Sequence, residues 1–227
     1  MEGRRNWADP RARFSRARDW NGILGKVSIS LPRSMSVMGM LHHPTVQSDN
    51  SMRGPTIHLR PPRMGDLREF LTAVKQSRNL HRGRVSPPSS PGSFRAYLNR
   101  ARQDDFRAFL ACRNETGAIA GVINIRQICR GPFQSAYLGF YVMEGHQGQG
   151  LMREALTLTL RIAFGQLKLH RLEANVQPAN VRSAALVKSL GFRLEGFSPR
   201  YLKIAGRWRD HERWAILREQ FVRTSGG

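Results

Sequence analysis

The residues best suited to binding chemistry lie in a glycine-rich segment, Gln147-Gly-Gln-Gly150, between a strand pattern and a helix pattern that begins at Leu151. Glycine lets the backbone approach a ligand closely, and the start of a helix offers N–H groups without intrahelical partners. Together these features favour binding of a pyrophosphate, although a glycine-rich surface turn is the plain alternative. The segment lacks the lysine of a Walker loop and the third glycine of a dinucleotide-binding fingerprint.

Further motifs follow in a fixed order along the chain. They are Arg130-Gly-Pro-Phe133, Tyr137-Leu-Gly-Phe140, Asn180-Val-Arg-Ser183, Gly191-Phe-x-x-Glu-Gly196 and Gly206-x-Trp-Arg-Asp-His211. With the glycine-rich segment they resemble the GNAT acetyltransferase superfamily, and within it the bacterial ribosomal-protein-alanine N-acetyltransferases. The resemblance covers about residues 56–221.

The resemblance implies that acetyl-CoA is the co-substrate. The pyrophosphate loop of the superfamily, Q/R-x-x-G-x-G/A, begins here at Gln147, and its last position holds Met152, which departs from the pattern. The residues that the resemblance assigns to acetyl-CoA are Val142, Gln147, Gly148, Gln149, Gly150, Leu151, Met152 and Asn180. Seven His and two Cys are scattered without chelating spacing, so no metal site is expected.

Acetyl transfer to an amine needs a base for the amine proton and an acid for the departing thiolate. In many members of the superfamily the acid is a Tyr, but Val187 occupies that position here. The ribosomal-protein branch implies Ser183 as the acid and Glu195 as the base. Glu173 is the rival base. Ser183 and Asn180 also suit a helix cap, and Glu195 suits an ion pair with an arginine.

Two other residues near these motifs are expected to be structural, with contact to the substrate as the alternative for each. Tyr201 is interpreted as a packed ring, and His211 is interpreted as a polar group whose hydrogen bonds are satisfied within the fold.

The elements that position these residues follow from hydrophobic periodicity and turn residues. Strands are expected at 56–60, 106–113, 118–128, 136–143 and 170–177, and in a final pair that turns at Ala205-Gly206. Helices are expected from Asp66 to Gln76, after a Ser93 cap, and at about 151–165 and 181–190. This order predicts an α+β fold. The resemblance implies the GNAT fold, a mixed, mostly antiparallel sheet flanked by helices, with a splayed strand pair at the acetyl-CoA cleft.

The chain has 227 residues and a formal net charge of +21. Residues 1–55 show no sustained apolar period and are expected to form a poorly ordered basic extension. The alternative is that the true start codon lies downstream and that this segment is not translated. Residues 56–221 are expected to form the acetyltransferase domain and 222–227 a tail. Residues 56–227 hold 28 Lys+Arg and 12 Asp+Glu, which favours a polyanionic partner: nucleic acid, the ribosome, an anionic membrane surface or a phosphate-rich cofactor. Charge alone does not choose among these.

The leading hypothesis is acetylation of the N-terminal α-amine of a protein, specifically a ribosomal protein that begins with Ala or Ser. The alternatives are a small amine (a polyamine, an aminoglycoside or an amino acid), and a ribosome- or RNA-binding module with a decayed transferase site. A polycation would need several carboxylates in a small volume, and few remain here. The acids placed on exposed helices and turns, or near the terminus, are Asp66, Glu69, Asp104, Asp105, Glu115 and Glu219.

The chain shows no apolar run long enough to span a membrane and no signal peptide pattern. We therefore expect a cytoplasmic protein, a monomer or weak dimer, without a membrane partner.

Overall fold

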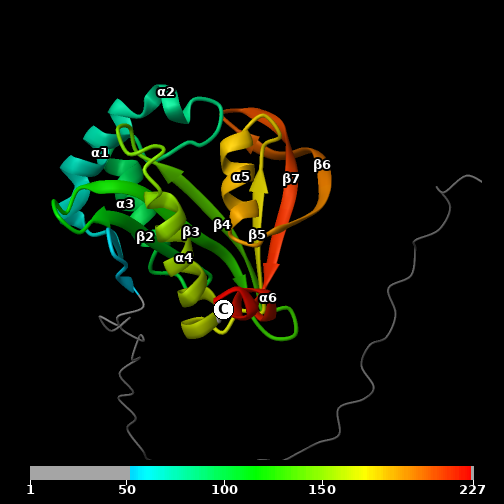
Figure 1. The fold of residues 1–227 in the computed structure, drawn as a ribbon. Helices are drawn as coiled ribbons and strands as arrows, with labels where there is room; N and C mark the ends of the chain where they lie inside the picture. The colour runs from blue at the N-terminus through cyan, green and yellow to red at the C-terminus, as the bar shows by residue number, and fades with distance from the viewer. Residues whose placement is uncertain (1–51, 226–227) are drawn as a thin grey trace, which may run out of the picture. The chain divides into compact units, whose positions relative to one another are not determined.

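The computed structural model describes residues 52–225, which form a seven-stranded sheet with flanking helices (Figure 1). The strand order is β1-β2-β3-β4-β5-β7-β6, and β4 and β5 form a parallel pair while the other neighbours are antiparallel. The strands are β1 Ile57–Arg60, β2 Phe106–Arg113, β3 Ile119–Cys129, β4 Ser135–Val142, β5 Arg171–Val176, β6 Arg193–Ile204 and β7 Arg207–Leu217. The helices are α1 Leu67–Gln76, α2 Arg78–His81, α3 Pro91–Arg100, α4 Leu151–Arg161, α5 Val181–Ser189 and α6 Arg218–Ser225.

Alternating side chains of the sheet enter two separate apolar cores. On β3, Ile123 packs in the core that contains Leu156 of α4, whereas its neighbour Val122 packs in the core that contains Phe70 of α1 and Phe94 of α3. Successive strand residues point to opposite faces, so α4 covers one face and α1 and α3 cover the other. The α+β arrangement expected from the sequence is confirmed.

The parallel pair separates partway along its length. β4 and β5 pair from Ser135 and Arg171 as far as Leu138 and Ala174. Beyond that point β4 continues to pair with β3 alone, up to Val142. In Figure 1 the two strands diverge towards the end that α5 covers. The gap between them is the splayed strand pair that the resemblance implied.

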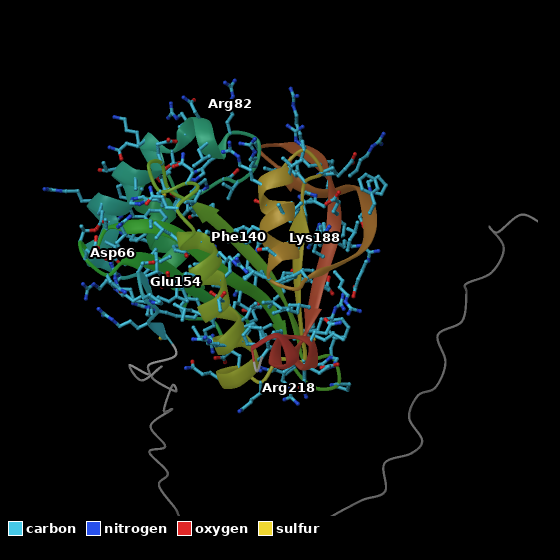
Figure 2. All side chains as sticks on the ribbon, in the orientation of Figure 1. Asp66, Arg82, Phe140, Glu154, Lys188 and Arg218 are labelled. Carbon is cyan, nitrogen blue, oxygen red and sulfur yellow. The ribbon has the colours of Figure 1, made fainter. Side chains whose placement is uncertain are left out.

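Helix α4 is attached to the edge strand β1 through Glu154 (Figure 2). Its carboxylate accepts hydrogen bonds from the backbone N–H groups of Thr56 and Ile57, at 2.9 and 3.0 Å, and from the Thr56 hydroxyl. Desolvation alone would raise the pKa of Glu154, but these donors outweigh it and lower that pKa. The first turn of α4 is therefore fixed to the start of β1.

Several local predictions differ from the structure. Ser93 was predicted to cap helix α3, but the helix begins at Pro91 and its cap is Ser90. The Ser90 hydroxyl accepts a hydrogen bond from the backbone N–H of Ser93. Asp66 was expected on an exposed position, but it is 4% exposed. Arg60 donates two hydrogen bonds to it, at 2.8 and 2.9 Å, and the N–H of Arg63 donates a third.

The predicted domain boundaries also shift. Helix α6 continues to Ser225, so the predicted tail at 222–227 includes its last turn. At the other end, Met52 is buried in the core and Arg53 bridges His58, so the folded part begins a few residues before 56. The remainder of the predicted extension, residues 1–51, lies outside the described residues.

Candidate active site

The glycine-rich segment forms the turn that leads from β4 into α4. Gly150 is the residue before the helix, and it has the left-handed conformation, with φ of 76°. The first helical hydrogen bond is donated by the backbone N–H of Glu154 to the carbonyl oxygen of Gly150, at 3.1 Å. The N–H groups of Leu151, Met152 and Arg153 therefore precede the helical ladder and are available at its positive end. This arrangement suits a phosphate group.

Side-chain hydrogen bonds fix the shape of this turn. Gln147 donates to Glu144, at 2.8 Å, and Gln149 donates to the backbone carbonyl of Gly145, at 2.7 Å. Gln149 also accepts from Arg113, at 2.9 Å. Both glutamines thus use their side chains to hold the loop, which leaves the backbone as the surface for a ligand. Gln147 borders the cavity described below, whereas Gln149 does not.

Met152, which departs from the family pattern, lies over a glycine of the sheet. A Cβ atom on Gly121 of β3 would lie 2.5 Å from Met152 Cε and 2.9 Å from the Tyr141 carbonyl oxygen. The larger side chain therefore fits at the loop because the strand beneath it has no side chain at that position. Gly121 and Met152 are mutually dependent in packing.

Helix α5 brings a second set of predicted residues to the same place. Asn180 caps this helix, and its side-chain oxygen accepts from the N–H of Ser183, at 3.3 Å. The capping interpretation of Asn180 is therefore confirmed. Both residues also border the cavity, so capping and ligand contact are compatible here. Val187, in the usual Tyr position, is completely buried in the core and has no acid–base chemistry.

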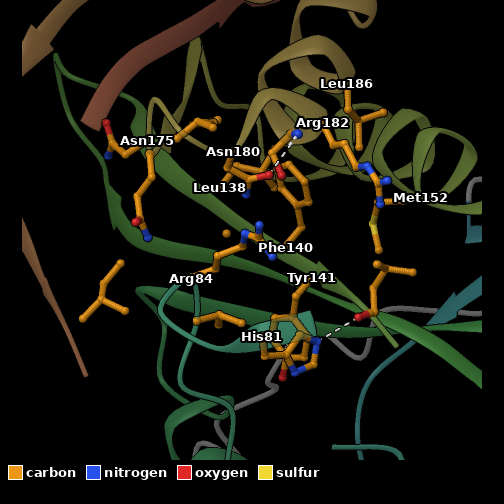
Figure 3. A pocket seen from close by; sticks show the side chains of 18 of the residues that line it. His81, Arg84, Leu138, Phe140, Tyr141, Met152, Asn175, Asn180, Arg182 and Leu186 are labelled. Atoms are coloured by element: carbon orange, nitrogen blue, oxygen red, sulfur yellow. Dashed lines mark hydrogen bonds between the residues drawn. The ribbon is translucent and has the colours of Figure 1, made fainter. Parts of the chain in front are cut away.

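A cavity of about 1840 Å³ runs along the gap between β4 and β5. Figure 3 shows Asn180, Arg182 and Met152 on one side of it and His81 and Arg84 on another. Of the residues predicted for acetyl-CoA, all but Gln149 border it. The charged side chains that line it, within residues 52–225, are Arg84, Arg100, Arg126, Arg153, Arg182 and Lys203. No carboxylate from that range lines it.

The cations fit an anionic cofactor. Arg153 and Arg182 come from α4 and α5, the two helices whose first residues border the cavity, and an anionic pyrophosphate is attracted by both charges and both helix starts. When bound, acetyl-CoA supplies an activated acetyl thioester. The backbone at Gln147–Met152 and the Asn180 side chain are the groups that would hold it.

Across the gap from the loop, two tyrosines and a histidine border the cavity. A hydrogen bond with Tyr201, on β6, raises the pKa of Tyr137, on β4, to about 12. The rings of Tyr201 and His211, on β7, lie 6.2 Å apart between centroids. Residues from three strands therefore border the cavity on this face, although a structural role was the leading sequence interpretation for Tyr201 and His211.

The predicted bases Glu195 and Glu173 share one arginine. Arg171 donates to Glu173 at 2.8 Å and to Glu195 at 3.0 Å. Hydrogen bonding to Arg171 holds the pKa of Glu195 below its ordinary value. Neither carboxylate borders the cavity. The structure brings both predicted bases together beside β5, and their catalytic role stays a prediction.

His211 has features of a base that the sequence interpretation overlooked. Its Nδ1 lies 2.9 Å from the Arg209 carbonyl oxygen, so a neutral ring donates there and keeps a lone pair on Nε2. Desolvation lowers the pKa of His211 despite that bond and the charge of Asp210, which favours the neutral ring near pH 7. The signal in the sequence was its place in the Asp210-His211 motif, where a structural role was preferred to contact with the substrate.

Residues 56–193 match the family model described as "Acetyltransferase (GNAT) domain". This stretch includes the sheet as far as β5, the glycine-rich loop and α5. The fold and the loop define an enzyme class whose members transfer the acetyl group of acetyl-CoA to an amine. The chain belongs to the GNAT family and is an N-acetyltransferase.

Individual relatives span several substrate types. The chain is 31% identical over 174 residues to "Probable N-acetyltransferase YjcK" of Bacillus subtilis, covering 73% of this chain and 96% of that protein. It is 45% identical over 93 residues to "[Ribosomal protein uS5]-alanine N-acetyltransferase" of Escherichia coli, which is 41% of this chain and about half (48%) of that protein. It is 25% identical over 120 residues to "Spermidine N(1)-acetyltransferase" of Escherichia coli, 53% of this chain and 62% of that protein.

A solved structure, "Mycobacterium smegmatis RimJ in complex with CoA-disulfide", superimposes with a TM-score of 0.67 at 27% identity, over 76% of this chain and 93% of that one. The predicted fold class and family are confirmed by these comparisons. Within residues 52–225, no group of three or more His, Cys, Asp or Glu side chains is placed to hold a metal ion. In the same range, no helix combines the length and apolar character needed to cross a membrane.

Proposed function

We propose that this enzyme acetylates the N-terminal α-amine of a protein, and that the acceptor is a ribosomal protein that begins with Ala or Ser. The observation that carries the proposal is the charge of the cavity. Its lining, as far as residues 52–225 supply it, contains six Arg or Lys side chains and no Asp or Glu. A polyamine or aminoglycoside would place several positive charges among those cations, and nothing there would neutralise them.

A peptide N-terminus makes smaller demands on such a cavity. It brings one amine, a small first side chain that fits near the thioester, and an extended backbone that can bond to strand edges. The resemblance in sequence to the uS5-alanine enzyme supports this choice over the weaker resemblance to the spermidine enzyme. A neutral or anionic small amine, such as an amino acid, is the runner-up that the same charge pattern permits.

Within this proposal the chain supplies the proton transfers. The amine gives up its proton to a base, for which Glu195 is the assignment from the family resemblance and Glu173 and His211 are the alternatives. Ser183, on the first turn of α5, donates a proton to the departing thiolate. Ser183 borders the cavity, whereas Glu195 and Glu173 do not, which supports its assignment more directly than theirs.

The basic surface supports a ribosomal setting. Residues 56–227 carry 28 Lys+Arg against 12 Asp+Glu, and cations of this number attract RNA phosphates. We propose that the enzyme acts in the cytoplasm, as a monomer or weak dimer, in contact with the ribosome. Salt should weaken that contact, because each Lys or Arg contact with phosphate displaces counterions.

Intact-mass analysis of acetyl-CoA reactions tests the acceptor class. The panel contains peptides that begin with Ala, Ser or a bulky residue, the same peptides with a blocked α-amine, and spermidine, kanamycin and free amino acids. We expect acetylation of the unblocked Ala and Ser peptides and little of either polycation. Faster turnover of spermidine or kanamycin than of every peptide would refute the proposal and favour a small polycationic substrate.

A further inference from the structure

Arg126, on β3, is an exposed cation that borders the cavity and whose side chain has no partner among residues 52–225. It forms no hydrogen bond or ion pair with any residue that the structure describes, and it borders the cavity. Its guanidinium lies against Gly139 of β4, where a Cβ atom on the glycine would be 3.2 Å from Arg126 Nη2. The missing side chain at Gly139 is what leaves room for the guanidinium.

The position of Arg126 places it on the acceptor side. It is in register with Tyr137, whose ring lies on the face opposite α4. Gly139 follows Leu138, the last residue of β4 that pairs with β5. Arg126 therefore lies beside the mouth of the gap, on the face of the sheet opposite α4.

Two other cations on this side, Arg84 and Lys203, also lack a carboxylate partner among residues 52–225, so their charges are not neutralised there. Arg84 donates to a backbone carbonyl, at 3.1 Å, and Lys203 has no carboxylate partner among residues 52–225. Arg100 differs, because its guanidinium is paired with Asp105. The walls of the cavity partly desolvate Arg126 and lower its pKa, since no carboxylate compensates. A planar guanidinium in such a place is best matched by a carboxylate, which it can bind through two hydrogen bonds.

We propose that Arg126 binds a carboxylate side chain within the first few residues of the acceptor, so that the enzyme prefers N-termini followed closely by Asp or Glu. The inference rests on the proposed function, since it assumes a peptide acceptor. An extended peptide advances by about 3.3 Å per residue, so a side chain near the α-amine remains inside the cavity. The amine itself enters the gap between β4 and β5.

Peptide competition tests this specificity. The substrates begin with Ala and carry either Glu or Lys at the second, third or fourth position of an otherwise neutral sequence. For the wild type, kcat/KM for the best Glu peptide should exceed that of its Lys counterpart by about tenfold, as one charge-assisted hydrogen bond would give. Arg126→Gln should remove the preference and Arg126→Glu should reverse it.

A matched control isolates the position from the change of charge. Arg95 on α3 is exposed and does not border the cavity, so Arg95→Glu makes the same change elsewhere and should keep the wild-type preference. All variants should keep the wild-type melting temperature, because the Arg126 side chain forms no hydrogen bond or ion pair with any residue of 52–225. Titration of each variant with CoA measures separately any change in cofactor affinity.

Three results would count against the inference. Equal rates for Glu and Lys peptides in the wild type would refute it while the proposed function survived, since alanine peptides would still be acetylated. Loss of RNA binding in Arg126→Glu with an unchanged peptide preference would mean that the arginine binds a phosphate of RNA instead. Turnover of a small amine with no acetylation of any peptide would refute the proposed function, and the inference with it.

Discussion

Replacement of Gly150 by Ala tests the phosphate-loop assignment, and Gly145 provides a matched control. Both glycines belong to the turn between β4 and α4 and have positive φ, 76° at Gly150 and 82° at Gly145. A Cβ atom at either position would have no protein atom within 4 Å. The conformational cost of Ala is therefore similar at the two sites, about 1–2 kcal/mol. Only Gly150 borders the cavity.

The two variants should separate stability from binding. Each should lower the melting temperature by roughly 2–8 °C, since 1 kcal/mol corresponds to about 2–4 °C for a domain of this size. In Gly150→Ala the added methyl group should displace the pyrophosphate from at least one N–H donor. A lost charge-assisted bond is worth about 1.5–3 kcal/mol, or about ten- to a hundredfold in affinity. Gly145→Ala should bind CoA as the wild type does.

Titration calorimetry with CoA measures this difference, and thermal unfolding of the same samples measures the cost to the fold. The reasoning would be refuted if both variants bound CoA with equal affinity, or if Gly145→Ala lost more affinity than Gly150→Ala. The bulkier Gly150→Val should bind CoA more weakly still, although a β-branched residue at positive φ also costs more stability.

Two further predictions concern the buried ion pair and the base. Asp66→Asn should lower the free energy of unfolding by about 2 kcal/mol, as measured by denaturant unfolding. The loss is smaller than for a fully buried ion pair because Arg60 is partly exposed. Asp105→Asn, which breaks a more exposed ion pair, should change the stability little. If His211 is the base, kcat/KM should fall as the pH drops through a pKa below 6.5, and His211→Asn should abolish that limb. If Glu195 is the base, Glu195→Gln should lower kcat by roughly 10²–10⁴-fold while CoA binding survives, and a rate within twofold of wild type would exclude it.

The local structure around the residues predicted for acetyl-CoA could be predicted from the sequence. Its geometry depends on neighbours along the chain: a strand, a turn that needs glycine at positive φ, and a helix that starts at Leu151. The same holds for Asn180, whose cap bond reaches three residues ahead. Local physics determines such features, and a short motif records them.

Elements that depend on distant contacts could not be predicted in this way. Asp66 is a plausible exposed cap in the sequence, but the chain reverses after Arg60 and places the two side chains together in a buried pair. The short helix α2 was not predicted, because four residues carry too little periodicity to indicate a helix. Helix α6 was also missed; Phe221 on it packs against Phe164, with ring centroids 5.6 Å apart.

The acceptor half of the site shows the same limit more strongly. Arg126, Tyr137, Tyr201 and His211 come from four different strands and border one cavity, which runs along the gap where β4 and β5 separate. In the sequence, Arg126 is one of 28 Lys and Arg residues after position 55. Nothing in the sequence around it distinguishes it from the residues that form ion pairs. What distinguishes Arg126 is its position in the structure, where its guanidinium lies against Gly139 and has no carboxylate partner among residues 52–225. The loop that suits a pyrophosphate carries no information about the acceptor. Relatives of the chain are described as acting on ribosomal-protein alanine or on spermidine. Under the proposed function, the face across the gap selects the acceptor, and the charged side chains that line it within residues 52–225 are positive.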